Sequence, residues 1–180
     1  MRMETTDEDL AFAAASGDEA AFACLLDRHY NRLFAFCFRL TGTRTEAEDL
    51  TQDICAALPA KLQSYQRRAK LSTWLYRVAV NAAHDRRRRG SAYVKATAGW
   101  GDWEVNRTAG AIEDAAKSDW LIRAMASLND DLRDTLALIL DDMTHSQAAD
   151  ILGVSEGTIS WRMSMAKTRL KEFKAKEDAP

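Results

Sequence analysis

The chain has 180 residues, of which 47% are hydrophobic and only two are proline, and its formal net charge is −2. This length allows one or two small domains, and this composition favours a packed, mostly helical protein. The sequence has no apolar run as long as a membrane span and its charged N-terminus is unlike a signal peptide, so we expect a cytoplasmic protein without membrane insertion.

Charge is distributed unevenly along the chain. Residues 1–60 carry 5 basic and 11 acidic side chains, a net charge of −6, whereas residues 61–90 carry 9 basic side chains and 1 acidic one, a net charge of +8. An acidic section followed by a basic one indicates two partners of opposite character. The basic section suits the phosphate backbone of a nucleic acid, although a solvated basic face would have the same composition.

Two capped helical patterns precede the basic section. A capping box at Ser16 predicts a long helix that ends near Gly42, with His29 at the edge of its apolar face. A second capping box, at Thr45, predicts another helix, which Pro59 should bend or end. The outward face of this second helix carries Asp49, Gln52 and Asp53.

A polar loop over residues 63–70 leads to a third predicted helix, which Ser72 should cap and which should run to about Arg88. One face of this helix carries aromatic, cationic and amide groups at three- and four-residue steps. Such groups suit base stacking combined with phosphate contact. They are Trp74, Arg77, Asn81, His84 and Arg88.

The composition changes after the third helix. Residues 90–110 contain four of the eight glycines and are predicted to be a linker. Helical patterns then resume, and Asn129 is expected to cap one of them. The sequence therefore predicts an all-α protein of two small helical domains joined by a flexible linker. The predicted boundaries are 1–90, 91–116 for the linker, and 117–180.

Residues 144–170 form a predicted helix-turn-helix. Thr144 and Gln147 make a capping box that starts a short helix, and Gly153 ends it in the left-handed region. Ser155 then caps a second helix, of the kind that enters a DNA major groove. An ordinary helical hairpin with a glycine turn is the alternative interpretation.

Catalytic chemistry finds little support in the sequence. We find no activated serine or cysteine and no metal-ligand spacing, so we expect neither an enzyme nor a cofactor. The three cysteines form no C-x-x-C pattern, and we expect them to be buried free thiols. They are Cys24, Cys37 and Cys55.

Three segments carry a resemblance to a known family. They are EAEDLTQD at 46–53, STWLYRVAVNAAHDRRRR at 72–89, and LGVSEGTISWRM at 152–163. Their order and spacing resemble those of bacterial extracytoplasmic-function (ECF) sigma factors, the two-domain subunits that give RNA polymerase its promoter specificity. The resemblance implies three partners: core RNA polymerase, promoter DNA and an anti-sigma factor.

In that family the acidic helix docks on the clamp coiled coil of the largest polymerase subunit. This implies a core-polymerase site, although a plain acidic surface is the alternative. The implied residues are Asp49, Leu50, Gln52 and Asp53.

The basic helix of that family lies beside melted minus-ten DNA, where an asparagine matching Asn81 helps to hold a flipped base. The loop that precedes this helix completes the pocket. Here it reads YQRRAKL instead of an F-R-G-like sequence, so the resemblance does not carry over the base preference. The implied minus-ten residues are Tyr65, Arg67, Arg68, Lys70, Trp74, Arg77, Asn81, His84 and Arg88.

The C-terminal helix pair resembles the domain that reads the minus-thirty-five element. Family members carry more basic side chains there, so we expect DNA contact that is electrostatically weaker or tuned to an unusual sequence. The resemblance also implies that the linker threads toward the active-site and RNA-exit channels. The implied minus-thirty-five residues are Ser155, Glu156, Gly157, Thr158, Ser160, Trp161, Arg162 and Met165.

Two other functions compete with a promoter-recognition subunit. A sigma mimic would titrate an anti-sigma factor without touching DNA, and the poorly basic helix from Ser155 favours it, whereas the basic-aromatic helix argues against it. A helix-turn-helix repressor would leave the acidic helix and the second DNA-facing helix unexplained.

Overall fold

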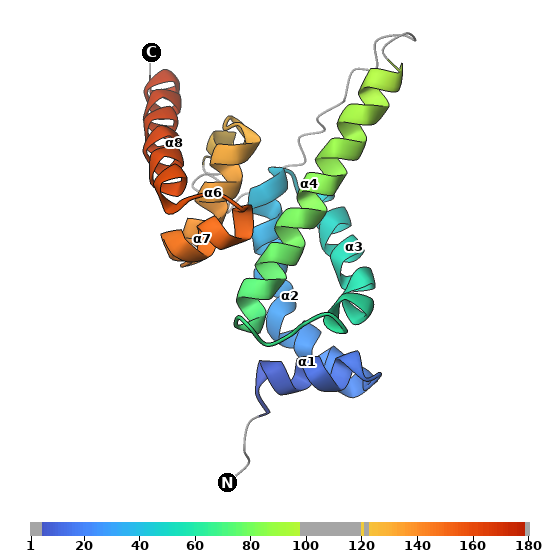
Figure 1. Ribbon diagram of the computed structural model, residues 1–180. Helices are drawn as coiled ribbons and strands as arrows, with labels where there is room; N and C mark the ends of the chain where they lie inside the picture. Colours follow the sequence, from blue (N-terminus) through green and yellow to red (C-terminus); the bar gives the residue numbers. More distant parts are fainter. Residues whose placement is uncertain (1–4, 98–119, 121–122, 179–180) are drawn as a thin grey trace.

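The computed structural model describes residues 5–97, 120 and 123–178, and every regular element within these ranges is helical. This confirms the predicted all-α class. Helices α1–α4 form an N-terminal half, and α6–α8 form a C-terminal half that lies against α2 and α4 (Figure 1). The helices are α1 (Asp7–Ala15), α2 (Glu19–Thr41), α3 (Arg44–Leu62), α4 (Leu71–Thr97), α6 (Asp130–Leu140), α7 (His145–Leu152) and α8 (Glu156–Glu177).

The fold is built around two hydrophobic clusters, and the larger one continues from the N-terminal half into α6, α7 and α8. In the larger one, the Phe36 ring of α2 is fully buried and its centroid lies 4.6 Å from that of Tyr76 in α4. In the smaller one, Leu10 of α1 packs near Leu62 and Leu71, where α3 ends and α4 begins. Burying one such side chain stabilises a fold by about 1.5–3 kcal/mol, so α1 is an integral part of this half.

The starts of the first helices differ from the predictions. Helix α1 was not predicted. Ser16, which was predicted to begin α2, instead ends α1, since its hydroxyl donates to the Phe12 carbonyl at 3.1 Å. Asp18 caps α2 because its carboxylate accepts from the amides of Ala20 and Ala21, both at 3.0 Å. An ionised acceptor beside a helix N-terminus is favoured over a hydroxyl.

The cap of α3 lies two residues before the predicted one. Thr43 and Thr45 both fit the T-x-x-E pattern, but Thr43 accepts from the Glu46 amide and follows Gly42, which ends α2 in the left-handed region. Because Gly42 ends α2, Thr43 already has the extended backbone conformation of a cap, and α3 begins at Arg44. Pro59 does not end α3, which continues to Leu62.

Helix α4 also differs from its prediction at both ends. It begins at Leu71, so Ser72 lies inside its first turn. It continues to Thr97, past the predicted end near Arg88 and through Gly90. The remainder of the predicted linker, residues 98–116, lies outside the described residues.

The helix-turn-helix forms as predicted. Thr144 accepts from the Gln147 amide while the Gln147 side chain accepts from the Thr144 amide at 2.9 Å. Gly153 ends α7 with φ of 66°, and the Ser155 hydroxyl accepts from the Thr158 amide at 3.1 Å. Asn129 caps α6 as predicted.

The cysteines are not all buried. Cys37 is buried, and this burial raises the pKa of its thiol to about 11, so the group stays protonated. Cys55 is half-buried, but Cys24 is exposed on α2, which corrects the prediction for this residue.

Replacing Gly42 by alanine should lower the free energy of unfolding for two reasons, and the same replacement of Gly17 is a matched control. Gly42→Ala places a Cβ at φ +80°, 3.3 Å from the Ala126 Cβ, whereas Gly17→Ala has φ +96° and open space. The left-handed conformation costs a non-glycine residue about 1–2 kcal/mol at either site. Overpacking should add about 1 kcal/mol or more at Gly42 alone. Urea denaturation measures both variants, and equal losses would contradict a tight contact at Gly42.

Candidate nucleic-acid interface

Part of the predicted minus-ten face of α4 lines an open groove. Arg77, Asn81 and His84 form its α4 side, and residues 150–153 of α7 and the following turn form the other. The groove has a volume of about 480 Å³. The two remaining residues of the predicted face lie elsewhere, because Trp74 packs its ring 5.3 Å from that of Tyr65 and Arg88 pairs with Asp85.

A buried carboxylate lies beside this groove. Asp134 of α6 is 2% exposed, and its side chain is held from α4 by Arg87 at 2.6 and 3.1 Å and by His84 at 2.8 Å. Arg87 belongs to the arginine run over 86–89 that the sequence predicts to contact phosphates with non-specific, salt-dependent affinity, but here it is paired with Asp134. Its pairing depends on where α6 docks, which no local pattern indicates.

A second carboxylate joins α6 to α2. Asp141, at the end of α6, pairs closely with Arg39 and lies 4.0 Å from Arg32. On the same side, Arg133 donates to the Leu40 carbonyl at 3.3 Å. The two halves are thus joined by charged groups on α2 and α4 in addition to the hydrophobic cluster that both halves share.

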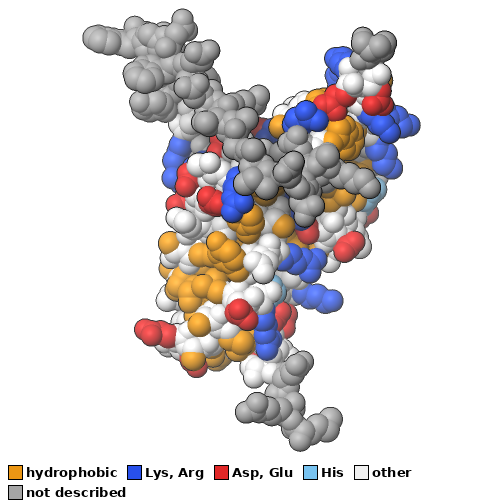
Figure 2. Space-filling model, turned by 180° about the vertical axis from the view of Figure 1, so that it is seen from behind, with side chains coloured by type: hydrophobic (Ala, Val, Ile, Leu, Met, Phe, Trp, Pro, Cys, Tyr) orange, Lys and Arg blue, Asp and Glu red, His pale blue; other side chains and the backbone are white. Residues whose placement is uncertain are grey.

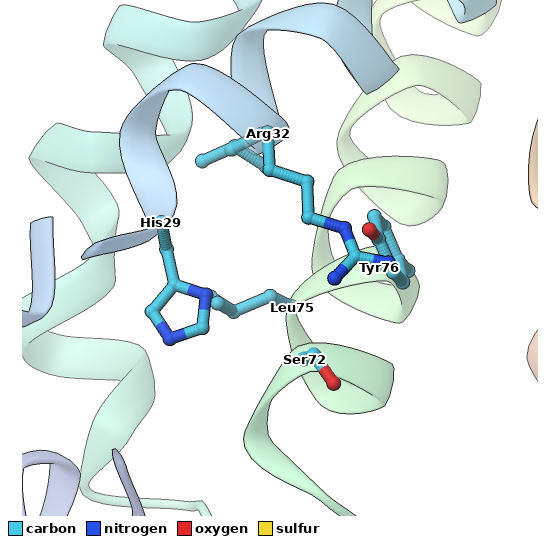
Figure 3. A pocket seen from close by; sticks show the side chains of 6 residues that line it. His29, Arg32, Ser72, Leu75 and Tyr76 are labelled. Carbon is cyan, nitrogen blue, oxygen red and sulfur yellow. The ribbon is translucent and has the colours of Figure 1, made fainter. Parts of the chain in front are cut away.

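The small cavity between α2 and α4 is not a ligand site. Its volume of about 10 Å³ is at the lower limit for a single water molecule. The Arg32 guanidinium lies over the Tyr76 ring, 5.7 Å from its centroid, and His29 lies on the other side (Figure 3). His29 bonds to Asp7 at 2.8 Å, which confirms it as a residue at the edge of the core.

Three of the four residues predicted to bind polymerase are exposed on α3. Asp49 and Asp53 are 54% and 70% exposed, and both pair with Arg86 of α4, at 2.9 and 3.2 Å. Gln52 is exposed beside them. Leu50, which was predicted with them, is 1% exposed and belongs to the hydrophobic core. Its contribution to any surface on α3 is therefore to hold the helix in place.

The residues predicted on α8 differ in how exposed they are and in whether other parts of the chain hold them. Trp161 is 62% exposed, whereas the Arg162 side chain is 13% exposed and pairs with Asp131 of α6 at 2.9 Å. Ser160 is hydrogen-bonded to His145 at 3.2 Å. Three further members are exposed and two are half-buried. The exposed ones are Ser155, Glu156 and Gly157, and the half-buried ones are Thr158 and Met165.

In the loop before α4, Arg68 and Lys70 are exposed, whereas Tyr65 is hydrogen-bonded within the loop and Arg67 is held by α1. The reverse face of the molecule shows basic and acidic side chains interspersed, with a hydrophobic patch in its lower half (Figure 2). Within the described ranges, no helix is long and apolar enough to cross a membrane. Among the same residues, no group of His, Cys, Asp or Glu could hold a metal ion.

A helical N-terminal half with an exposed polar face, followed by a helix-turn-helix, defines a two-part nucleic-acid-binding protein. Comparison with known proteins narrows this class. Residues 25–93 match the Sigma-70 region 2 family and residues 118–170 match the Sigma-70 region 4 family.

Relatives that align over most of their own length agree with these two family matches. The ECF RNA polymerase sigma factor SigM of Mycobacterium tuberculosis is 33% identical over 94% of this chain and 85% of its own length. SigW of Bacillus subtilis is 28% identical over 87% of this chain and 90% of its own. The solved structure of the sigma factor RpoE from Bartonella quintana, in complex with the anti-sigma factor NepR, has a TM-score of 0.71 and 28% identity and covers 88% of this chain and 98% of its own. The chain belongs to the ECF RNA polymerase sigma factor family.

Asp134→Asn should separate the two halves. Removing one partner of a buried ion pair usually costs about 3–5 kcal/mol, because the other charge is left uncompensated. We expect a lower free energy of unfolding and a larger radius of gyration in small-angle X-ray scattering. Asp131→Asn is the control, since it breaks the Arg162 pair within the C-terminal half and should leave the radius unchanged. Unchanged dimensions in both variants would contradict the role of Asp134.

Proposed function

We propose that this ECF sigma factor binds core RNA polymerase through α3 and directs it to promoters with two elements. The loop over 63–70 and α4 read the minus-ten element, and α8 reads the minus-thirty-five element. The observation that carries this proposal is the presence of a region 2 match and a region 4 match, in that order, in one chain. The protein contributes recognition and no catalytic step, and it acts in the bacterial cytoplasm, where polymerase and chromosome are found.

The exposed carboxylates of α3 support a role in polymerase binding. Asp49 and Asp53 point outward, and their partner Arg86 is itself 40% exposed. Exposed ion pairs contribute at most about 1 kcal/mol, so a basic surface of the polymerase can displace Arg86 at little cost.

Replacing Asp49 and Asp53 together by alanine should weaken binding to core polymerase in a fluorescence titration. The melting temperature should change little, since exposed residues outside caps and core usually matter by about 0.5 kcal/mol or less. Arg86→Gln is the matched control, because it breaks the same two pairs and leaves both carboxylates. If Arg86→Gln weakens polymerase binding as much as the double variant does, the carboxylates act only within the chain.

The minus-ten assignment rests on the groove-lining side of α4. Arg77 and Asn81 are exposed there, and an amide can hydrogen-bond the edge of an unpaired base. In the observed arrangement α7 faces these residues across the groove. Melted DNA therefore needs α7 to move away from α4, and phosphates would then replace Asp134 as the partner of Arg87.

Asn81→Ala should lower transcription from a cognate promoter more than it lowers binding to a duplex minus-thirty-five fragment, since the amide is assigned to an unpaired base. Both quantities are measured on the reconstituted holoenzyme, transcription on the cognate promoter and binding on the duplex fragment. Equal losses on the two DNAs would instead make Asn81 a structural residue.

An anti-sigma factor is the proposed regulator. The structural relative RpoE is itself held by an anti-sigma factor, which supports this partner here. A sigma mimic remains the second candidate, favoured by the sequestered Arg162 and the exposed Trp161 of α8. Mapping transcripts made by core polymerase with this protein separates the two, because a mimic starts none.

A further inference from the structure

Helix α1 holds the loop that precedes α4, and this contact is not part of the region 2 match, which begins at residue 25. The Arg67 guanidinium, in the middle of the loop, donates to the Glu8 carbonyl and to the Asp9 carboxylate, both at 3.0 Å. It also lies over the Phe12 ring, 5.6 Å from the centroid. Three contacts with one helix, from residues little more than a turn apart, therefore meet at a single side chain.

The same helix holds the end of the loop. The Glu8 carboxylate accepts from the Leu71 amide at 3.2 Å. Leu71 is the first residue of α4, where amides have no partner within their own helix. Glu8 thus supplies, from a different helix, the acceptor that the predicted cap Ser72 cannot supply from inside the first turn.

The loop conformation needs such support. Arg67 has φ of 55°, a left-handed conformation that a non-glycine residue adopts only when its surroundings hold it. Within the loop, the Tyr65 hydroxyl donates to the Ala69 carbonyl at 2.7 Å, which closes one turn. The Thr6 hydroxyl and Arg67 lower the pKa of Asp9, so its carboxylate stays charged at neutral pH.

We propose that α1 is a positioning clamp for the minus-ten loop, in which Glu8 and Asp9 set the loop conformation and thereby its choice of base. Because Arg67 is occupied by α1, the exposed Arg68 and Lys70 are the loop cations available to DNA. This inference rests on the proposed minus-ten function of the loop. It assigns part of promoter specificity to a helix that touches no DNA.

The test compares three single variants with the wild-type protein, each combined with core polymerase. Asp9→Asn weakens the Arg67 contact, and Glu8→Ala removes the acceptor for Leu71. Asp7→Asn is the matched control, since it removes an equal charge from the same turn of α1 but contacts Arg28 and His29 of α2. Transcription is measured on a cognate promoter and on promoters with single substitutions in the minus-ten element.

We expect Asp9→Asn and Glu8→Ala each to reduce discrimination between cognate and substituted promoters by about two- to tenfold, the usual range for one hydrogen bond. Affinity for core polymerase should be unchanged. Glu8→Gln should restore discrimination because its amide oxygen still accepts from Leu71. A uniform gain on all promoters, or an equal effect of Asp7→Asn, would mean that charge alone acts and would overturn the clamp.

Hydrogen exchange on the free protein separates this inference from the proposed function. The Leu71 amide should exchange faster in Glu8→Ala, and its protection should persist in Asp7→Asn and Glu8→Gln. Unchanged exchange in Glu8→Ala rejects the clamp whatever transcription shows. If the Leu71 amide exchanges faster in Glu8→Ala but the wild-type protein starts no transcription, the clamp is supported and the sigma-factor function is rejected.

Discussion

The pairing of Asp134 with Arg87 ties α6 to α4 at the junction of the two halves, beside the hydrophobic cluster that both halves share. A carboxylate that is 2% exposed is costly unless charged and hydrogen-bonding partners surround it. Arg87 and His84 satisfy it from α4, so α6, which packs on α2, is tied to α4 as well. Helix α7 follows after a short turn and is thereby placed beside Asn81, which creates the groove. The accessibility of the proposed DNA-binding face therefore depends on a contact made outside it.

Several basic side chains assigned to external partners are paired with carboxylates of the same chain. The exposed pairs are Arg67–Asp9 and Arg86–Asp49, and Arg162–Asp131 is half-buried. The exposed pair Arg86–Asp49 is worth at most about 1 kcal/mol, so the polymerase can replace it readily, whereas α1 holds Arg67 through two further contacts. The Asp134 pair differs because separating the halves also uncovers the apolar core that they share. That separation is therefore the larger internal cost that the proposed promoter binding has to offset.

Local signals predicted the helix-turn-helix correctly and the N-terminal helix starts incorrectly. At Thr144 the two hydrogen bonds of the capping box support each other, and at Gly153 the residue type suits the left-handed conformation without help from its surroundings. Near α2 and α3 two acceptors compete, Ser16 with Asp18 and Thr45 with Thr43, and the choice depends on how the preceding helix ends. Helix α1 was missed because its alanine-rich face becomes a packing surface only against α2, α3 and α4.

The sequence by itself determined the helical class, the helix-turn-helix and the family resemblance, because caps, apolar periods and motif order are local properties. It also placed the acidic residues on one face of α3, since helical spacing alone does so. The tertiary structure decided which charges are used internally. Asp134 pairs with Arg87, and the Glu8 carboxylate accepts from the Leu71 amide, although the partners lie far apart in the sequence. Such pairings follow from helix packing, which brings together groups that no sequence spacing relates.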